Sequence, residues 1–203
     1  MIRIGLTGSI GMGKSTSAKL FAGSGIPVND SDAVVHDLYA GAAAPLVEAE
    51  FPGTVKDGAV DRQELGRQLS QRPDGFEALE RIVHPLVRQR EAEFVARERA
   101  RGSEMVLLDI PLLFETGAED RVDIIVVVSC DPQIQRDRVL ARPNMTEEKF
   151  NMILSRQTPD AEKRARADYV IDTSHPIETT RRRVNEIIAD LKARIAKGEF
   201  RNA

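Results

Sequence analysis

The sequence contains no tryptophan and only one cysteine, Cys130, and aromatic residues make up 4% of it. A single cysteine excludes a disulfide within the chain and a cysteine-rich zinc site. So few aromatic side chains argue against a broad surface on which nucleic-acid bases could stack. These absences remove disulfide-rich domains, zinc fingers and base-stacking modules from the candidate classes. Cys130 is expected to be a small buried apolar residue.

Long apolar runs and an excess of one charge are also missing. No run approaches the roughly 20 residues that cross a bilayer. Lys and Arg number 29 against 32 Asp and Glu, a net charge of −3, so bulk basicity does not draw the chain to nucleic acid or membranes. The opening residues have a strand pattern rather than that of a secretory signal. We expect a soluble cytoplasmic protein, most simply a monomer, with no nucleic-acid or membrane partner.

What the sequence does contain is a series of short apolar runs separated by helical patterns. Such near-continuous runs are typical of strands buried on both faces of a parallel sheet. Five of them occupy residues 2–7, 26–30, 105–109, 122–128 and 169–172. Apolar residues at three- and four-residue steps mark a C-terminal helix from Val184 to Ile195. The 203 residues therefore predict one α/β domain with a parallel five-stranded sheet flanked by helices.

Two long helical stretches interrupt the alternation of strands and helices. One runs from Asp32 to Ser103 without a convincing strand, and a shorter, highly charged one runs from Asp131 to Arg166. Ligands of open α/β sheets bind beyond the carboxyl ends of the strands. We interpret both stretches as excursions that cover a ligand there, rather than as independent domains.

A phosphate-binding motif lies between the first strand and a helical run. Residues 8–15 read GSIGMGKS and match G-x-x-x-x-G-K-[ST]. Glycines let the loop N–H groups approach phosphate oxygens, and the following helix adds its positive end. Lys14 can reach the β- and γ-phosphates, and the Ser15 hydroxyl can hold Mg²⁺. The motif predicts a nucleoside triphosphate site; the alternative is a glycine-rich turn with an exposed lysine.

The motif does not identify the phosphoryl acceptor. A GTPase usually carries an N/T-K-x-D motif, which is absent from the sequence, and a large motor ATPase needs a longer chain. A small-molecule kinase fits a short chain with two covering stretches. A kinase acting on a nucleoside monophosphate and a nucleotide-binding regulator without acceptor chemistry both remain as alternatives.

Three carboxylates follow predicted strands. Asp30 and Asp32 stand at the end of the second strand and Asp109 at the end of the third. Asp32 lies just past its strand and is the better candidate to accept the proton of an acceptor hydroxyl. Asp30 is expected either to cap the next helix or to hold magnesium through water. Asp109 is a candidate for indirect magnesium contact, and the apolar loop 110–115 after it either packs inward or lines the substrate.

Together these motifs resemble the dephospho-coenzyme A kinase family, nearly from end to end. The matching segments are Leu6–Thr16, Asp30–Asp32, Asp61-Arg62 before Leu65, His84-Pro85, Pro111–Glu115, Arg138 to Arg142, Arg156-Gln157 and Ala167–Asp172. The phosphate loop alone is common to many families, but its combination with Asp-x-Asp, His-Pro and Pro-Leu-Leu-Phe-Glu at these distances is specific. His36 is a departure, because many members have arginine there, and a charge role at this position is left open.

The resemblance implies a P-loop kinase fold with a helical substrate-binding insertion and a lid. It implies transfer of a phosphoryl group from Mg²⁺-bound ATP to the ribose 3′-hydroxyl of dephospho-coenzyme A, the last step of coenzyme A synthesis. On this interpretation residues 1–203 form a single domain. Its core would be 1–36, 103–131 and 167–203, its coenzyme-binding insertion about 37–102 and its lid about 132–166.

The resemblance also assigns site residues. Arg142 would be the lid arginine that closes over the transferring phosphoryl group, and Arg138, predicted on the same helix face, would bind nucleotide. Arg62, His84 and Leu113 would contact the substrate with Asp32. His84 precedes Pro85, which is expected to break its helix and turn the imidazole away. Nucleotide would bind to Gly11, Met12, Gly13, Lys14, Ser15, Thr16, Arg138 and Arg142, and adenine near Thr173–Pro176. Ion pairs or surface positions are the alternatives for these arginines and for His84.

Overall fold

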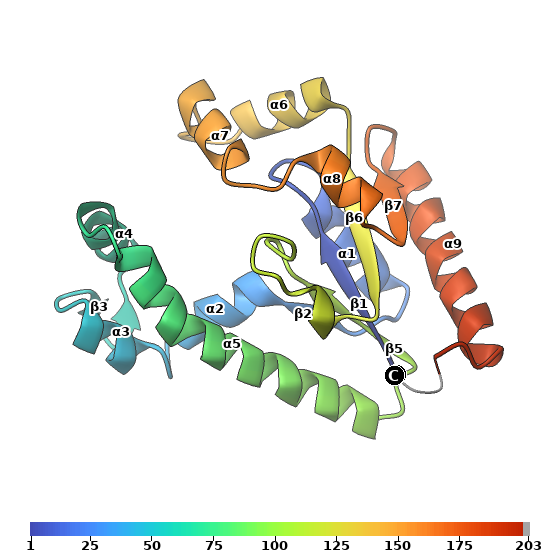
Figure 1. The fold of residues 1–203 in the computed structure, drawn as a ribbon, viewed down its shortest axis with the longest axis horizontal. Coiled ribbons are helices and arrows are strands. Elements are labelled where there is room, and N and C mark those ends of the chain that lie inside the picture. The colour runs from blue at the N-terminus through green and yellow to red at the C-terminus, as the bar shows by residue number, and fades with distance from the viewer. Residues whose placement is uncertain (201–203) are drawn as a thin grey trace. The chain divides into compact units, whose positions relative to one another are not determined.

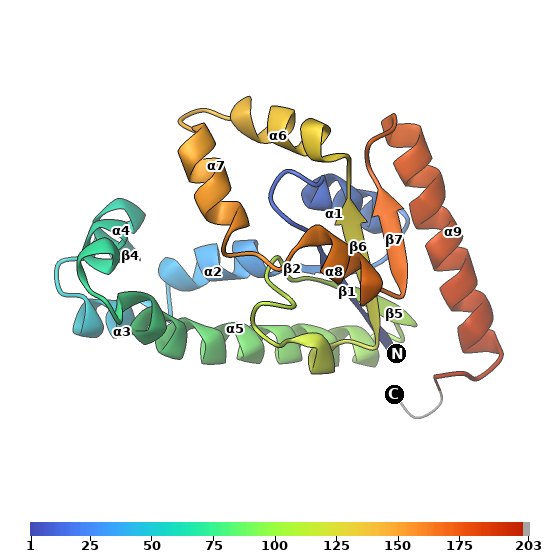
Figure 2. The same ribbon diagram turned by 45° about the horizontal axis from the view of Figure 1, so that its top comes forward.

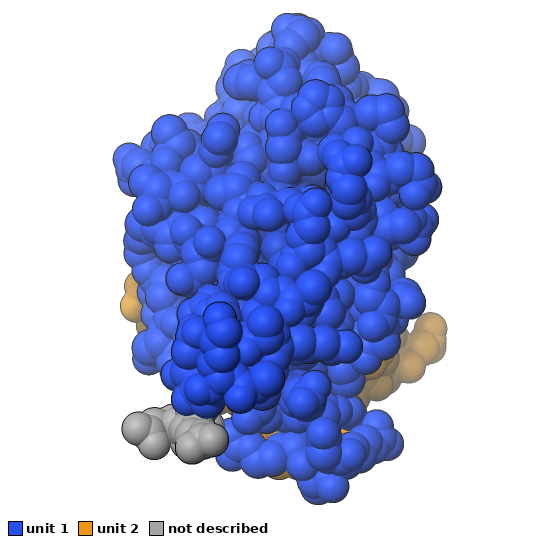
Figure 3. Space-filling view, turned by 90° about the vertical axis from the view of Figure 1, so that its right-hand side faces the viewer, with its two compact units in different colours: residues 1–29, 98–203 blue, residues 30–97 orange. Residues whose placement is uncertain are grey.

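The protein is described by a computed structural model, and the description covers residues 1–200 (Figure 1). These residues form two compact units, coloured separately in Figure 3. One unit consists of residues 1–29 and 98–203, and the other of residues 30–97. The expected division into core, insertion and lid stays a prediction.

The larger unit is built on a five-stranded sheet. The strands are β1 (Ile2–Thr7), β2 (Val28–Asp30), β5 (Met105–Asp109), β6 (Ile124–Ser129) and β7 (Tyr169–Asp172), in the order β2-β5-β1-β6-β7. The pairs β1–β5, β1–β6 and β6–β7 are parallel. All five strands were predicted from their apolar runs, and the predicted α/β fold with a parallel sheet is confirmed.

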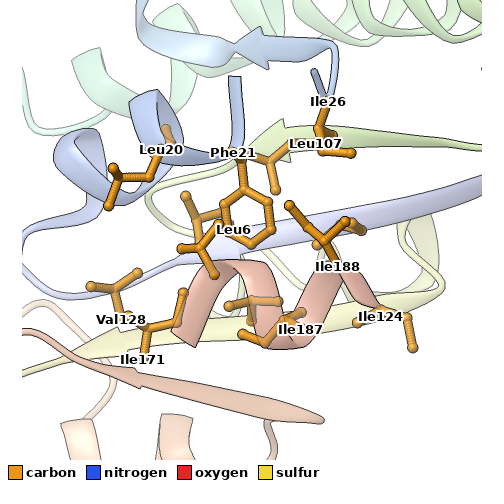
Figure 4. Packing of buried hydrophobic residues seen from close by; sticks show 14 of the residues in the cluster. Leu6, Leu20, Phe21, Ile26, Leu107, Ile124, Val128, Ile171, Ile187 and Ile188 are labelled. Carbon is orange, nitrogen blue, oxygen red and sulfur yellow. The ribbon is translucent and has the colours of Figure 1, made fainter. Parts of the chain in front are cut away.

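Two helices cover one face of this sheet. The helices are α1 (Lys14–Gly23) and α9 (Ile177–Ala196). Because side chains alternate along a strand, Ile4 and Leu6 point to the same face, where they join Phe21 of α1 and Ile187 of α9 in one buried cluster (Figure 4). Each such side chain contributes roughly 1.5–3 kcal/mol on full burial. This cluster anchors the helix that begins at the phosphate loop.

Shorter helices complete the unit. They are η1 (Glu119–Arg121, a 3₁₀ turn), α6 (Pro132–Leu140), α7 (Glu147–Leu154) and α8 (Asp160–Ala165) (Figure 2). Helix α8 packs on β6. Leu113, in the loop after β5, packs on Gly5, where an added Cβ would lie only 2.8 Å from Leu113 Cδ1. The apolar loop 110–115 therefore packs inward at Leu113, which is fully buried.

The smaller unit is mainly helical, with its own apolar core. It holds α2 (Ser31–Tyr39), α3 (Ala44–Glu50), β3 (Val55–Lys56), β4 (Ala59–Val60), α4 (Arg62–Gln71) and most of α5 (Gly75–Ala100). Its buried cluster is Leu38, Ala43, Ala44, Val47, Phe51, Val60, Leu65, Leu69 and Ala78. Among the described residues no helix is long and apolar enough to cross a membrane.

Two expectations for this unit are wrong. The stretch contains an antiparallel hairpin, β3–β4, turning at Asp57 and Gly58, which have φ of 49° and 80°. Its strands have two residues each, too few for an alternating pattern, although Asp-Gly is a hairpin turn signal. Pro85 does not break its helix, because α5 continues through it. One missing N–H in a helix of 26 residues leaves the neighbouring turns intact.

Candidate functional site

The phosphate loop is shaped by glycines with positive φ. Gly11 and Gly13 have φ of 80° and 92°, a region that side chains other than hydrogen disfavour. A Cβ on Gly11 would lie 2.4 Å from Val139 Cγ2. Helix α1 starts directly after Gly13, which offers no side-chain cap. Its first-turn N–H groups therefore remain available to an anion.

Lys14 lies beside a buried carboxylate. Its Nζ is 2.5 Å from Asp109 Oδ1, and the side chains are 14% and 3% exposed. Asp109 ends β5 and is in register with Leu6 near the end of β1, so the two strands bring the pair together. Burying this carboxylate without a cation would be costly. The interpretation of Asp109 as a magnesium contact stays a prediction.

Thr173, at the end of β7, links Arg138 to the phosphate loop. The Thr173 hydroxyl donates to the Met12 carbonyl at 2.7 Å and accepts from Arg138 Nη1 at 2.9 Å. Arg138 Nη2 also donates to the Thr173 carbonyl, at 2.7 Å. Arg138 is therefore held over the end of β7 rather than in the helix-face ion pair that was its alternative. This position beside the loop suits a phosphate or base contact.

The prediction that Arg142 shares a helix face with Arg138 is wrong. Helix α6 ends at Leu140, two residues before Arg142, because Pro143 and Asn144, with its positive φ, follow closely. The Arg142 side chain is exposed. Arg136, nearby on α6, is instead engaged by Glu147, with Nη2 to Oε2 at 2.6 Å.

The smaller unit contains a pocket of about 500 Å³ lined by Asp32 and Arg62. The other lining residues are Val35, Tyr39, Leu65, Gly66, Leu69 and Leu79. The Arg62 guanidinium lies 5.4 Å from the centre of the Tyr39 ring, and its Nη2 is 3.3 Å from His36 Nδ1. Burial raises the pKa of the Tyr39 phenol, and Arg62 offsets part of that rise. A cation, a carboxylate and an apolar wall thus face one cavity.

Asp30 caps helix α2, which was one of its two expected roles. Its Oδ1 accepts from the Asp32 N–H at 2.9 Å and from the Ala33 N–H at 3.1 Å. Asp32 follows in the first helical turn, where it is exposed and lines the pocket. The cap fixes the backbone of Asp32 while its carboxylate stays available.

Neither His84 nor Leu113 is among the residues that line the pocket of Asp32 and Arg62. His84 lines a different depression, of about 340 Å³, with Glu77, Glu80, Arg81, Pro85 and Arg88. It does not line the Asp32 pocket, and Leu113 is buried against Gly5. Substrate contact by either residue stays a prediction.

Three residues around the phosphate loop were not anticipated as its supports. The family resemblance places Thr173 only near adenine and gives Gln157 only as a matching residue, and the sequence carries no signal for Gln135. Gln135 Nε2 donates to the Ile10 carbonyl at 2.7 Å, and the Ile10 N–H donates to Gln157 Oε1 at 3.1 Å. No local pattern signals such contacts, because each joins residues more than 100 positions apart.

The residues present fit a magnesium nucleotide. The uncapped start of α1 supplies N–H donors, and Lys14 supplies a cation. Ser15 and Thr16 are exposed on the first turn, so Ser15 can offer a hydroxyl oxygen. Mg²⁺ prefers one or two protein oxygens together with substrate phosphates and water. The loop therefore has the donors for phosphate and an oxygen for the ion that accompanies it.

Comparisons with known proteins agree with this arrangement. The sequence model of the family described as Dephospho-CoA kinase matches residues 2–179. A curated protein of that name from Rhizobium etli is 76% identical over 203 residues, and the match covers 100% of each chain. Another from Rhizobium meliloti is 62% identical over 193 residues, covering 95% of this chain and 100% of its own.

Solved structures agree as well. One from Thermus thermophilus has a TM-score of 0.81 at 35% identity, with 94% of this chain and 97% of that chain covered. The structure of a dephospho-CoA kinase from Campylobacter jejuni has a TM-score of 0.72 at 23% identity, with 98% of each chain covered, and supports the fold. Because the family's sequence model spans residues 2–179 and curated members match end to end, this chain belongs to the dephospho-CoA kinase family.

Proposed function

We propose that the protein transfers the γ-phosphoryl group of ATP to the ribose 3′-hydroxyl of dephospho-coenzyme A, giving coenzyme A and ADP. The observation that carries the proposal is the 76% identity, over the whole chain, with a curated protein named for this activity. The uncapped loop before α1 and the pocket lined by Asp32 and Arg62 support it. A cytoplasmic location and a monomeric state belong to the same proposal.

The larger unit holds the nucleotide on this proposal. N–H groups of the loop and of the first turn of α1 donate to phosphate oxygens, and Lys14 leaves Asp109 in part to meet them. Ser15 would hold magnesium, with Asp109 as an indirect contact, and the ion would neutralise charge on the transferring group when it is bound. Arg138 and Thr16 complete the nucleotide contacts.

The smaller unit holds the acceptor on this proposal. Dephospho-coenzyme A carries a diphosphate, and Arg62 offers a bidentate donor for a phosphate at the pocket. Asp32 accepts the proton of the attacking hydroxyl and orients it. His84 and the loop around Leu113 are the remaining candidates for coenzyme contact.

Arg142 completes the proposed mechanism. It lies beyond the end of α6 on the exposed surface of its unit, where its guanidinium is available to a ligand. We propose that it closes over the transferring phosphoryl group and stabilises the charge that spreads over its oxygens. The same closure excludes water, which would otherwise compete as the acceptor.

An acceptor panel tests the proposed function. Turnover of ATP is measured by a coupled ADP assay with dephospho-coenzyme A, adenosine monophosphate, other nucleoside monophosphates and no acceptor. We expect turnover with dephospho-coenzyme A to exceed that with every other acceptor by at least tenfold, and the product to carry its new phosphate at the 3′ position by ³¹P NMR. Faster turnover with a nucleotide would overturn the proposal.

The variant Asp32→Asn separates chemistry from nucleotide binding. We expect kcat to fall at least about 10²-fold, the usual contribution of a general base, while ATP affinity changes little. Asp37→Asn is a matched control, because Asp37 is exposed on the same helix and does not line the pocket. A near-normal kcat for Asp32→Asn would remove Asp32 as the base, and an equal loss in both variants would point to helix α2 itself.

A further inference from the structure

The two peptide groups that flank Ile10 in the phosphate loop are each held by a glutamine side chain. The Ile10 carbonyl accepts from Gln135 Nε2 at 2.7 Å, and the Ile10 N–H donates to Gln157 Oε1 at 3.1 Å. Gln135 is on α6 and only 5% exposed, while Gln157 lies in the connection from α7 to α8. In Figures 1 and 2 this connection passes beside the loop between β1 and α1.

The neighbouring residue fixes the place of Gln157. The Thr158 N–H donates to Glu115 Oε1 at 2.8 Å. The same carboxylate oxygen lies 2.8 Å from Lys163 Nζ, whose side chain is 0% exposed. A buried ion pair therefore holds the backbone one residue after Gln157, and Gln157 in turn holds the loop.

The type of side chain at residue 157 also affects how the loop receives a phosphate. A glutamine oxygen accepts a hydrogen bond and brings no charge, so it can fix the Ile10 N–H without repelling an incoming phosphate. A carboxylate at the same place would accept the bond as well, but it would set a negative charge beside an anion site. A methionine would fill a similar volume and accept almost nothing.

We propose that Gln157 is a positioning residue for nucleotide binding and that Glu115 acts through it. Neither side chain needs to touch the nucleotide. Gln135 and Gln157 set the orientation of the two peptide groups that flank Ile10, and through them that of the following amides of the loop that face phosphate. Glu115 keeps Gln157 in register by holding the Thr158 N–H. Affinity for the nucleotide phosphates thus depends on a partly buried carboxylate outside the loop.

Nucleotide binding without acceptor tests this inference. The dissociation constant of ADP, with and without Mg²⁺, is measured by calorimetry for the full chain and for Gln157→Met, Gln157→Glu and Glu115→Gln. Gln133→Met is the control, because Gln133 is an exposed α6 residue whose side-chain amide bonds Asp137 rather than the loop. Melting temperatures are recorded so that each measurement is made on folded protein.

We expect Gln157→Met to weaken ADP binding about tenfold, which corresponds to 1.4 kcal/mol, and to raise the KM for ATP with kcat nearly unchanged. Gln157→Glu should weaken it further, and added salt should reduce the extra loss because it screens charge. Glu115→Gln should weaken ADP binding several-fold. The double variant Gln157→Met, Glu115→Gln should bind like Gln157→Met alone, because the two residues act in series.

Several outcomes would overturn the inference. These are an unchanged ADP affinity in Gln157→Met, a loss as large in Gln133→Met, and additive losses in the double variant. A fall in kcat with no change in nucleotide affinity would assign Gln157 to chemistry and also contradict it. The inference takes from the proposed function only that the loop binds a nucleotide. Its failure would therefore leave the result of the acceptor panel unchanged. A wild-type chain that binds no ADP would instead count against the proposed kinase itself.

Discussion

The phosphate loop of the larger unit and the Asp32 pocket of the smaller unit are held in opposite ways. The loop backbone is bonded by the side chains of Gln135, Gln157 and Thr173, and Lys14 lies against buried Asp109. The pocket instead presents the exposed side chains of Asp32 and Arg62 beside an apolar wall, and the Arg62 contacts there are a ring face and an imidazole.

This difference has a physical reason. Phosphate is bound through N–H groups that must point to one place before the ligand arrives, since reorganising them would cost binding energy. An acceptor pocket lined by long side chains can gain part of its order from the substrate. Changes around the loop should therefore affect nucleotide affinity and stability, and changes in the pocket should affect acceptor kinetics.

The largest expected effect comes from Arg142, an exposed arginine of the larger unit. Arg142→Gln should lower kcat by about 10³-fold or more, because an arginine that stabilises the transferring phosphoryl group contributes 10³–10⁵ in rate. ADP affinity in the absence of acceptor should change little, and pre-steady-state quench-flow would place the loss in the chemical step. Arg136→Gln is the control, since Arg136 is paired with Glu147. Equal losses in both variants would assign the effect to α6 rather than to a transition-state arginine.

The second-largest effect is expected on the free energy of unfolding, at the ion pair of Lys163 and Glu115. Lys163→Met should lower the free energy of unfolding by about 3 kcal/mol, because it leaves the partly buried Glu115 carboxylate charged and without its cation. For a chain of this length that corresponds to a fall of roughly 10 °C in Tm by calorimetry. Adding Glu115→Leu to Lys163→Met should recover part of the loss, and no recovery would show that the pair does not account for it.

The loss in Lys163→Met should depend on pH. Burial raises the pKa of Glu115, but the Lys163 ammonium and the Thr158 N–H outweigh it, so the pKa is lowered overall. A lowered carboxyl pKa stabilises the fold above the unfolded value of about 4.3 and loses that effect as pH falls through the folded pKa. Without Lys163, burial raises the Glu115 pKa, so the carboxyl of the variant takes up a proton at higher pH than that of wild type. The difference in Tm between wild type and Lys163→Met should therefore be full near neutral pH and shrink as pH falls from the raised pKa of the variant toward the lowered pKa of wild type.

The strands and the loop could be predicted because their signals are local. A run such as residues 124–129 is buried on both faces, and the glycines at 11 and 13 are required by their own φ angles. The capping role of Asp30 was likewise foreseen as one of two options, since it depends only on the next three residues.

The supports of the loop could not be predicted, since they depend on distant parts of the chain. Thr173 reaches Met12 only because β7 and β6 are parallel neighbours beside β1. The prediction of the Arg142 position was wrong for a different reason. Spacing of four residues implies a shared helix face only inside a helix, and α6 ends at Leu140.

A smaller effect is expected where Thr173 supports the loop. Thr173→Val keeps the volume and removes a hydroxyl that bonds both the Met12 carbonyl and Arg138. Leaving such groups without a partner costs about 1–2 kcal/mol, so the KM for ATP should rise roughly tenfold while the KM for the acceptor stays constant. Thr173→Ser should behave nearly as wild type. A rise in the acceptor KM instead would contradict the assignment of this residue to the nucleotide side.

The smallest effect is expected at the cap before Asp32, in the smaller unit. Asp30→Ala removes the acceptor for the Asp32 and Ala33 N–H groups and should cost about 1 kcal/mol of unfolding free energy. Since the cap fixes only the Asp32 backbone, kcat should fall a few-fold, far less than for Asp32→Asn, with ATP affinity unchanged. Asp30→Ser keeps a capping oxygen and should restore both quantities, as urea unfolding and steady-state kinetics would show. If Asp30→Ser lowered kcat as much as Asp30→Ala, the charge of Asp30 would contribute to the reaction. The pocket side chains of the smaller unit would then be positioned before substrate binds, as the loop amides of the larger unit are.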